Sequence, residues 1–378
     1  MKIRPRFSAK LPVVVLIGLM LLFLLQLVHA QTSHRKPGIP KRIVADYTNG
    51  SKYLNPPYDV AQIPFHKLTH INHAGVPWLS DGSLSVPDGF LEPDLITNAH
   101  AAGVKVLLLT GGDFAAAESD SSVLDTVVAN LQSFVSANGY DGLDVDWEFP
   151  QSATDAAFFV KLMARFRAVF PAPRYTLSID VAPWNVPYYN AVTMQKQIDY
   201  FNLMVYDCAG PWTTIGHLNS PIFWDSNDPR AGECEPGGSD QQAATMFLRN
   251  IPASQLNMGT PFYGYYYPDI TQLFGVCPGG SCSSTVAENY GPYIKQLVNQ
   301  QGWQRYYDPI SWVPYLLRTD GTPGFITYDD ARSTYLRVWY SDWVRGLGGT
   351  FMWSLDADYD GQSQDLLDAM YKASIGSH

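Results

Sequence analysis

Short apolar segments alternate with amphipathic segments along most of the chain. Between the third and fourth apolar runs, and after the fourth, apolar residues recur at the spacing of a helix with one buried face. Strands that alternate with helices pair in parallel through right-handed crossovers. Eight such units close a (β/α)8 TIM barrel, an α/β fold. The eight apolar runs that predict its strands begin at Arg42, Lys67, Lys105, Tyr140, Arg174, Ile198, Leu256 and Leu347.

The spacing of the apolar runs is interrupted once, between the seventh and the eighth. Short strand-like pieces lie there, among them QRYYDP, SWVPYLL and GFITYD. We therefore predict a barrel domain over residues 42–374 that carries a small α+β insertion, residues 265–331, between strand 7 and helix 7. No glycine-rich phosphate loop follows the first run, which argues against a doubly wound open sheet.

The N-terminal segment has the pattern of an export signal. Basic residues precede a run that is almost wholly apolar from Leu11 to Val28, and Val28-His29-Ala30 resembles a cleavage site. We predict a signal peptide over 1–30 and a polar linker over 31–41. The apolar run also approaches the length of a membrane-spanning helix, so an uncleaved anchor is the alternative. Either interpretation places the body of the protein outside the cytoplasm, secreted or periplasmic, and only the anchor would involve a membrane.

Export would allow the four cysteines to form disulfides. Cys277 and Cys282 frame the loop CPGGSC and could pair locally, leaving Cys208 with Cys234. Four cysteines allow three connectivities, and the sequence does not choose among them. A zinc site is the alternative, but no pair of histidines accompanies the cysteines at ligand spacing.

The formal net charge of −10 argues against nucleic acid as a partner, because phosphate binding requires a basic surface. A neutral or cationic ligand fits this charge better. Aromatic residues make up 13% of the chain, including ten Trp and 23 Tyr. Such side chains stack on the apolar faces of sugar rings, although they also fill protein cores.

The fourth apolar run contains DGLDVDWE, from Asp141 to Glu148, and carries the candidate chemistry. Side chains alternate along a strand, so Asp144, Asp146 and Glu148 share one face. In a barrel they would line the interior and rise toward the C-terminal rim, where active sites of this architecture lie. Carboxylates this close cannot all ionise, so at least one keeps a proton and can act as a general acid. A metal site or a solvated edge is the alternative, since alternating acids also occur in cation sites.

DGLDVDWE resembles the signature of the family 18 glycoside hydrolases, the chitinases and their relatives. The segments KVLLLTGGD, LMVYD, MGTPFYG and GGTFMWSLDAD resemble the family's third, sixth, seventh and eighth strands. FITYDDARS resembles part of the small module that many members carry after strand seven. The resemblance covers roughly residues 42–372 and implies a catalytic (β/α)8 barrel.

The resemblance also implies roles for individual residues. Glu148 would donate a proton to the glycosidic oxygen, Asp146 would bind the substrate's acetamido nitrogen, and Asp144 would cycle the shared proton. Tyr206 would bind the acetamido carbonyl. Trp353 would lie beneath the sugar, with Met204 and Asp207 beside it. Apart from the resemblance, the strand-end aromatics Tyr47, Trp184 and Trp212 are predicted to stack on sugars, with packing in the core or in loops as the alternative.

The spacing of the acids supports an unusual mechanism. Ordinary glycosidases place two carboxylates on opposite sides of the anomeric carbon, whereas Asp146 and Glu148 share one side of one strand. The substrate's own acetamido oxygen can attack instead, with retention of configuration, and family 18 enzymes are a known exception of this kind. No metal or cofactor is required.

Two segments depart from the family pattern. Leu109 stands where relatives have a Ser that supports the innermost acid, and Cys208 to Trp212 replace the usual turn after Asp207.

From the motifs taken together, we expect an endo-acting monomeric chitinase for chitin or chitooligosaccharides. The alternatives are a catalytically silent sugar-binding protein and an endo-β-N-acetylglucosaminidase acting on N-glycans or cell-wall glycan.

Overall fold

The computed structural model of the protein describes residues 41–229 and 236–376. The predicted signal peptide or anchor over 1–30, residues 31–40 of the predicted linker, and Cys234 lie outside these ranges. Among the described helices, none combines the length and the apolar character that crossing a membrane requires.

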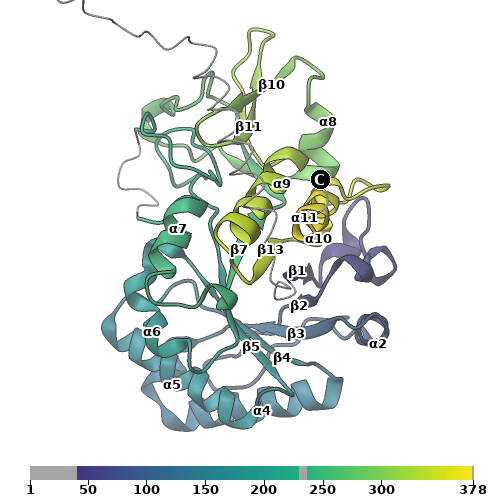
Figure 1. Ribbon diagram of the computed structural model, residues 1–378, viewed down its shortest axis with the longest axis vertical. Coiled ribbons are helices and arrows are strands. Elements are labelled where there is room, and N and C mark those ends of the chain that lie inside the picture. The colour runs from purple at the N-terminus through teal and green to yellow at the C-terminus, as the bar shows by residue number, and fades with distance from the viewer. Residues whose placement is uncertain (1–40, 230–235, 377–378) are drawn as a thin grey trace, which may run out of the picture. The chain divides into compact units, whose positions relative to one another are not determined.

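Eight parallel strands close into a barrel in the order β1-β13-β7-β6-β5-β4-β3-β2. Each strand pairs with the strand of the preceding unit, and β1 closes the ring against β13. The closed ring confirms the predicted (β/α)8 TIM barrel (Figure 1). Its strands are β1 Arg42–Thr48, β2 His70–Ala74, β3 Lys105–Thr110, β4 Gly142–Asp146, β5 Thr176–Val181, β6 Tyr200–Leu203, β7 Leu256–Pro261 and β13 Gly349–Trp353.

Side chains of the barrel strands alternate between the helical layer and the barrel interior. In β4, Leu143 and Val145 pack in the main hydrophobic core, whereas Asp144 is fully buried on the opposite face. In β1, Val44 packs inside the barrel near Tyr206, a residue that follows β6. The interior therefore receives every second residue of each strand.

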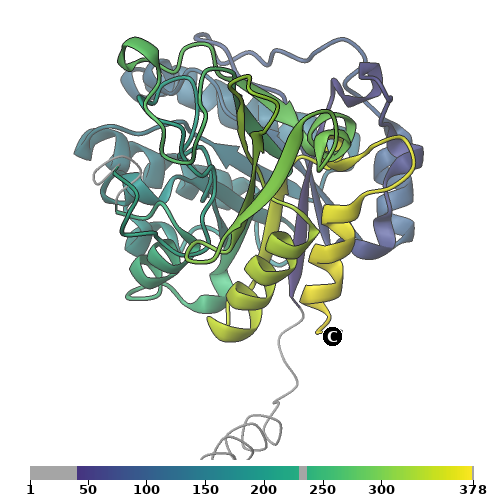
Figure 2. The same ribbon diagram turned by 90° about the horizontal axis from the view of Figure 1, so that it is seen from above.

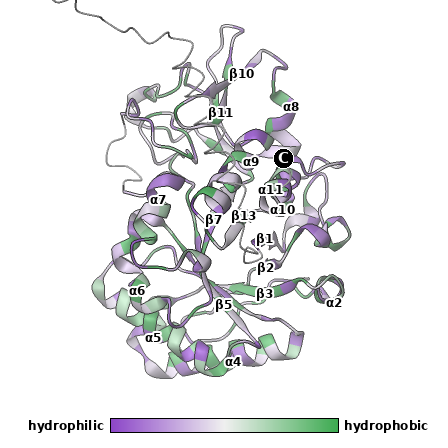
Figure 3. Ribbon diagram, viewed as in Figure 1, coloured by the Kyte–Doolittle hydropathy of each residue, from purple (hydrophilic) through white to green (hydrophobic). Residues whose placement is uncertain are grey.

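Helices surround the barrel and are bounded by ordinary caps. The Asp120 side chain accepts a hydrogen bond from the Ser122 amide at the start of α4, and Gly139 ends that helix with a left-handed φ of 78°. Figure 3 shows hydrophobic and hydrophilic residues side by side on α4 and α5, as expected of helices with one buried face. The helices are α2 Pro93–Ala101, α3 Phe114–Ser119, α4 Ser121–Asn138, α5 Ala153–Val169, α6 Ala191–Met194, α7 Asp240–Phe247, α9 Ala331–Trp339, α10 Leu355–Asp358 and α11 Asp365–Ser374.

A second, antiparallel sheet interrupts the barrel between β7 and α9. Its strand order is β10-β11-β12-β8-β9. The sheet begins at Tyr263, slightly before the predicted insertion at residue 265, because β8 follows β7 almost without a break. The strands are β8 Tyr263–Tyr267, β9 Val286–Asn289, β10 Trp303–Asp308, β11 Val313–Arg318 and β12 Phe325–Thr327, with the short helix α8 Lys295–Leu297 between β9 and β10.

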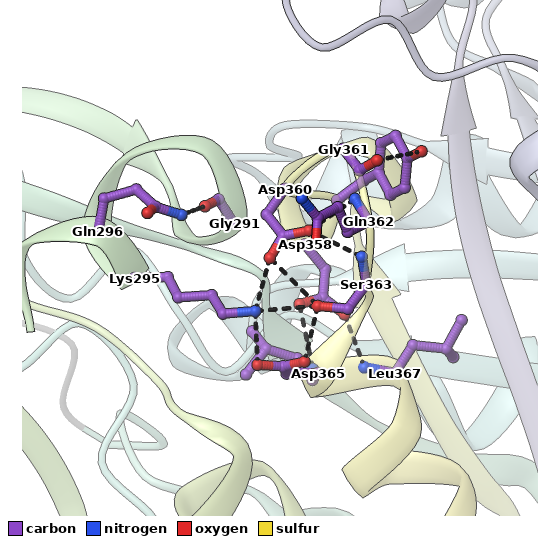
Figure 4. A network of polar contacts seen from close by, with 12 residues as sticks. Gly291, Lys295, Gln296, Asp358, Asp360, Gly361, Gln362, Ser363, Asp365 and Leu367 are labelled. Carbon is purple, nitrogen blue, oxygen red and sulfur yellow. Dashed lines mark hydrogen bonds and ion pairs between the residues drawn. The ribbon is translucent and has the colours of Figure 1, made fainter.

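Polar contacts join this insertion to the C-terminal part of the chain. Lys295 of α8 forms ion pairs of 2.6 Å with Asp360 and 2.7 Å with Asp365, and its ammonium also donates to Ser363 at 2.9 Å (Figure 4). Farther along the chain, helices α9 and α11 lie side by side (Figures 1 and 2). The insertion and the last helix are thus fixed against one another.

One cysteine pairing that the sequence left open is present in the structure. Cys277 and Cys282 form a disulfide, with their Cα atoms 5.2 Å apart. Cys208 is also disulfide-bonded, and its predicted partner Cys234 lies outside the described residues.

Candidate active site

The three acids of β4 and the residues after it rise from the barrel interior toward the carboxyl rim. Asp144 is fully buried, Asp146 is partly exposed, and Glu148 is exposed. Strand β4 lies unusually close to β5 where it begins, because a Cβ atom at Gly142 would be 1.8 Å from the Thr176 carbonyl oxygen. The exposure of these acids thus increases along the chain, so that the Glu148 carboxyl lies at the surface above the buried acids of the barrel interior.

Two asparagines link the buried acids. The Asn72 amide donates to Asp144 at 2.7 Å and to Asp46 at 2.9 Å. The Asn202 amide donates to Asp180 at 3.0 Å and, over 3.4 Å, to both oxygens of Asp144. All five side chains are buried, so the barrel interior contains a connected polar network rather than an apolar core.

The buried carboxyls hold protons more strongly than free aspartate does. Burial raises the pKa of Asp144 to about 6, while hydrogen bonds from its neighbours oppose the increase. Burial, and then the charge of Asp144, raise the pKa values of Asp46 and Asp180 further. The pKa of Asp146 is raised well above its usual value by burial and then by Glu148. Asp144 therefore loses its proton first, and the others remain neutral around it.

Glu148 shares a hydrogen bond with Asp146, and this contact lowers the pKa of Glu148 while it raises that of Asp146. Although the residue is exposed, the protein around its carboxyl partly removes it from water; this desolvation has the larger effect and raises the pKa of Glu148, and the negative charge of Asp207 raises it further. The carboxyls of Asp146, at the end of β4, and of Glu148, just after it, therefore share a proton close to the rim.

Asp207 follows β6 and is held by several donors. Its carboxylate accepts hydrogen bonds from the Tyr263 hydroxyl and from the Tyr265 hydroxyl, the second at 2.8 Å. Its backbone N–H donates to the Asn219 side chain at 2.9 Å, and its φ of 63° lies in the left-handed region that Asp tolerates. Burial raises the pKa of Asp207, and the two tyrosines oppose this increase.

Two cavities meet at Glu148. The first has a volume of about 530 Å³ and a wall of aromatic side chains, and the second has a volume of about 500 Å³. Residues Glu148, Phe149, Trp184, Asp207, Cys208, Trp212 and Thr213 line the first, whereas Gly112 to Ala115, Glu118, Asp146 to Phe149, Gln151 and Asp155 line the second. An extended ligand could therefore lie across Glu148.

The predicted sugar-binding residues differ in their exposure. Trp184 and Trp212 line the first cavity, and the Trp212 side chain is 60% exposed with its ring 5.7 Å from that of Tyr265. Trp353 is 38% exposed at the end of β13. Met204 and Tyr206 are buried together at the barrel rim. The structure thus brings Trp184, Trp212 and Asp207 to the same cavity as Glu148.

The structure contradicts the prediction that Tyr47 binds the sugar. Its side chain is fully buried, its ring stacks on His73 with the centroids 5.5 Å apart, and its hydroxyl donates to Glu92 at 3.2 Å. Strand alternation explains this position, because Ile43, Ala45 and Tyr47 all face the helical layer while Asp46 faces the interior. Tyr47 therefore does not reach the cavities.

Four buried polar residues of the site were not predicted from the sequence: Asp46, Asn72, Asp180 and Asn202. Each lies within a run that was predicted to be a strand. The available signal was a polar residue placed in an otherwise apolar strand, which in a barrel indicates an interior position with polar partners.

The site combines a carboxyl pair at the carboxyl rim of a closed β/α barrel with cavity walls made of aromatic side chains. This combination is typical of barrel enzymes that act on carbohydrates. The chain belongs to Glycosyl hydrolases family 18, whose sequence model matches residues 42–358.

Individual relatives are similar over much of the chain. Chitinase A1 of Niallia circulans is 26% identical over 78% of this chain, which spans 47% of that protein's length. Chitinase 1 of Aphanocladium album is 25% identical over 85% of this chain and 82% of that protein. The solved structure of the Ostrinia furnacalis Group IV chitinase in complex with allosamidin has a TM-score of 0.79 at 20% identity, covering 89% of this chain and 99% of that one. This last likeness concerns the fold.

Proposed function

We propose that the protein hydrolyses β-1,4-linked N-acetylglucosamine polymers, chitin or chitooligosaccharides, with retention of configuration. The observation that carries this proposal is the hydrogen bond between Asp146, the last residue of β4, and Glu148, which follows two residues later. Membership of family 18 supports it, as does the similarity to two chitinases, Chitinase A1 of Niallia circulans and Chitinase 1 of Aphanocladium album.

In the proposed first step, Glu148 protonates the glycosidic oxygen as the bond to the anomeric carbon breaks. Its raised pKa suits this role, because a general acid must still hold its proton near neutral pH. Glu148 and Asp146 are hydrogen-bonded to each other, and the proton in this hydrogen bond is the one that Glu148 would transfer. In the second step, Glu148 takes a proton from water, which attacks the anomeric carbon and breaks the bond between that carbon and the acetamido oxygen that displaced the leaving group.

The substrate's acetamido oxygen would act as the nucleophile, since Asp146 lies beside Glu148 rather than across the sugar from it. Asp146 would accept the acetamido N–H, and the Tyr206 hydroxyl would donate to the acetamido oxygen and fix its direction. An internal nucleophile held in this orientation gains the entropic advantage of an intramolecular reaction. The reaction therefore requires an N-acetyl group on the cleaved sugar.

The two cavities beside Glu148 support endo-type cleavage, because a linear polymer could occupy both. Trp353 would form the floor beneath the sugar at the scissile bond, with Met204 and Asp207 beside it. Trp184 and Trp212 would stack on neighbouring sugars. Export of the protein and a monomeric state remain predictions.

The test is release of a chromophore from aryl glycosides of chitobiose and chitotriose, with the cellobiose glycoside as control. We expect wild-type protein to cleave only the N-acetylated substrates. Glu148→Gln should lower kcat by roughly 10²- to 10⁴-fold and retain binding, since removing a general acid costs about this much. Near-normal turnover by Glu148→Gln would refute its role. Binding of chitooligosaccharides by wild-type protein without cleavage would instead indicate a sugar-binding protein.

A further inference from the structure

Asp180 is a fully buried acid in the barrel interior with no role in the mechanism described so far. It is the fifth residue of β5, and the parallel register places it directly opposite Asp146 of β4. Its side chain is 3% exposed and forms a hydrogen bond with Asp144. Asp180 therefore contacts the innermost acid from the strand next to the catalytic one.

The hydrogen bonds around Asp180 indicate which oxygen carries a proton. One carboxyl oxygen accepts the Asn202 amide at 3.0 Å. Asp144 accepts from Asn72 at 2.7 Å and lies 3.4 Å from the Asn202 nitrogen, so donors surround it. A hydrogen bond between two carboxyls requires one proton, and the partner that already accepts from two amides is the better acceptor. Asp180 is therefore the donor.

Asp146 does not supply this hydrogen bond. It is hydrogen-bonded to Glu148 instead, and one of its oxygens is buried without a partner. On β3, the residue opposite Asp144 in the register is Leu109, which has no donor. The ionised form of Asp144 is stabilised by hydrogen bonds with Ser178 and Asp180 of β5 and with the amides of Asn72 and Asn202.

We propose that Asp180 is a positioning residue that keeps its own proton and donates it to Asp144 in a hydrogen bond, so that Asp146 stays directed toward Glu148. This proposal rests on the function proposed above. Asp144 then remains ionised without drawing on the proton that Asp146 and Glu148 share. The order of pKa values agrees, because Asp144, with a pKa of about 6, is the acid that ionises first.

The other titratable groups that face Asp180 are consistent with a neutral carboxyl there. Asp46 of β1 and Asp146 of β4 add negative charge and raise its pKa. Tyr206 after β6 and Tyr189 after β5 are neutral, with pKa values raised mainly by burial. The cations Arg42 and Lys105 are the first residues of β1 and β3, at the other end of the strands.

The test compares two replacements of similar size. In Asp180→Asn, the amide N–H can donate to Asp144 and the amide oxygen can accept from Asn202, so kcat and both limbs of the pH profile should stay close to wild type. Asp180→Leu has no donor. Asp144 should then bind a proton more readily, so we expect kcat to fall roughly 10- to 100-fold, as for a lost hydrogen bond to a charge, with KM little changed. The acid limb of kcat should move to higher pH.

A different protonation state would give the opposite result. If Asp180 is ionised, Asp180→Asn removes a negative charge, and the acid limb must move to lower pH. Wild-type behaviour of Asp180→Leu would also overturn the proposal.

Asp342 serves as the control residue. It is a buried carboxyl in the segment Tyr340–Val344 and accepts a hydrogen bond from Ser374 at 3.1 Å. Asp342→Asn should leave the pH profile of kcat unchanged.

Infrared spectroscopy of protein labelled at the aspartate carboxyls decides the question without turnover. At neutral pH, unliganded Asp180→Asn should lack one protonated-carboxyl band of the wild type. Loss of a carboxylate band instead would overturn the proposal. This measurement also serves if Asp180→Leu does not fold. Failure of wild-type protein to cleave N-acetylated aryl glycosides would refute the proposed function and leave the infrared result valid.

Discussion

The behaviour of each acidic residue depends on what surrounds it rather than on its type. Asp144 is enclosed by the barrel, and burial raises its pKa to about 6. Asp360 is only partly buried, and its pKa is lowered to about 2, because Lys295, Ser363 and the Gln362 amide favour its charged form and outweigh desolvation. A nearby cation thus reverses the effect of desolvation.

At this scale, the charge of Asp207 should set the alkaline limit of activity. Because its negative charge raises the pKa of Glu148, Asp207→Asn should lower that pKa. Glu148 then loses its proton at lower pH, and the alkaline limb of kcat/KM should move in the acid direction. The measurement is a pH profile with the aryl chitobioside. An unchanged alkaline limb would show that the charge of Asp207 does not influence the pKa of Glu148.

Among the elements, the loop after β6 forms one wall of the first cavity, and the disulfide loop of the insertion packs against that loop. The Cys277 amide donates to the Thr214 carbonyl at 2.9 Å, and the Cys282 amide donates to the Thr213 carbonyl at 3.1 Å. Thr213 and Trp212 line the cavity. The disulfide therefore constrains a segment that holds an aromatic side chain over the cleft.

Replacing both cysteines, as Cys277→Ser with Cys282→Ser, should affect stability and binding of long substrates. Closing so short a loop is worth about 2 kcal/mol in the chain-entropy account. We expect urea denaturation to show a loss of this size, and KM to rise more for chitohexaose than for aryl chitobioside. Ser281→Ala, within the same loop, is the control. Equal KM changes for both substrates would show that the loop does not hold Trp212.

For the whole molecule, buried acids make folding stability depend on pH. The pKa values of Asp342 and Asp358 are raised to about 7, in each case mainly by burial. A carboxyl whose folded pKa lies above its unfolded value binds more protons when folded. Its contribution is fully present below the unfolded pKa, near 4, and is lost as the pH rises through about 7.

Asp342→Asn should therefore reduce the loss of stability between pH 5 and pH 8. The amide cannot ionise, so the difference between variant and wild type should grow with pH, to on the order of 2 kcal/mol. Denaturant unfolding at several pH values measures this difference. A constant difference across the range would show that Asp342 does not titrate on unfolding.

Much of the site was predictable because it lies within one strand and the two residues that follow it. Asp144, Asp146 and Glu148 alternate in sequence, and a strand places such residues on one face whatever its neighbours are. Asp180 contacts Asp144 only through the register between β4 and β5, and no local pattern specifies that register. An aromatic residue near a strand end, such as Tyr47, suggests a sugar-binding side chain, but alternation with Asp46 places Tyr47 on the outer face of the barrel.

The sequence by itself determined the eight strand units, the barrel they form, the family and the line of acids at its rim, because periodicity and short motifs are local properties of the chain. Only the tertiary structure decided which acids lie together, which oxygens accept from Asn72 and Asn202, and which aromatics reach the cavities. These depend on strand register, barrel closure and burial. Burial and neighbouring charge set the pKa values, so the partners of each acid become known only when all eight strands are in place.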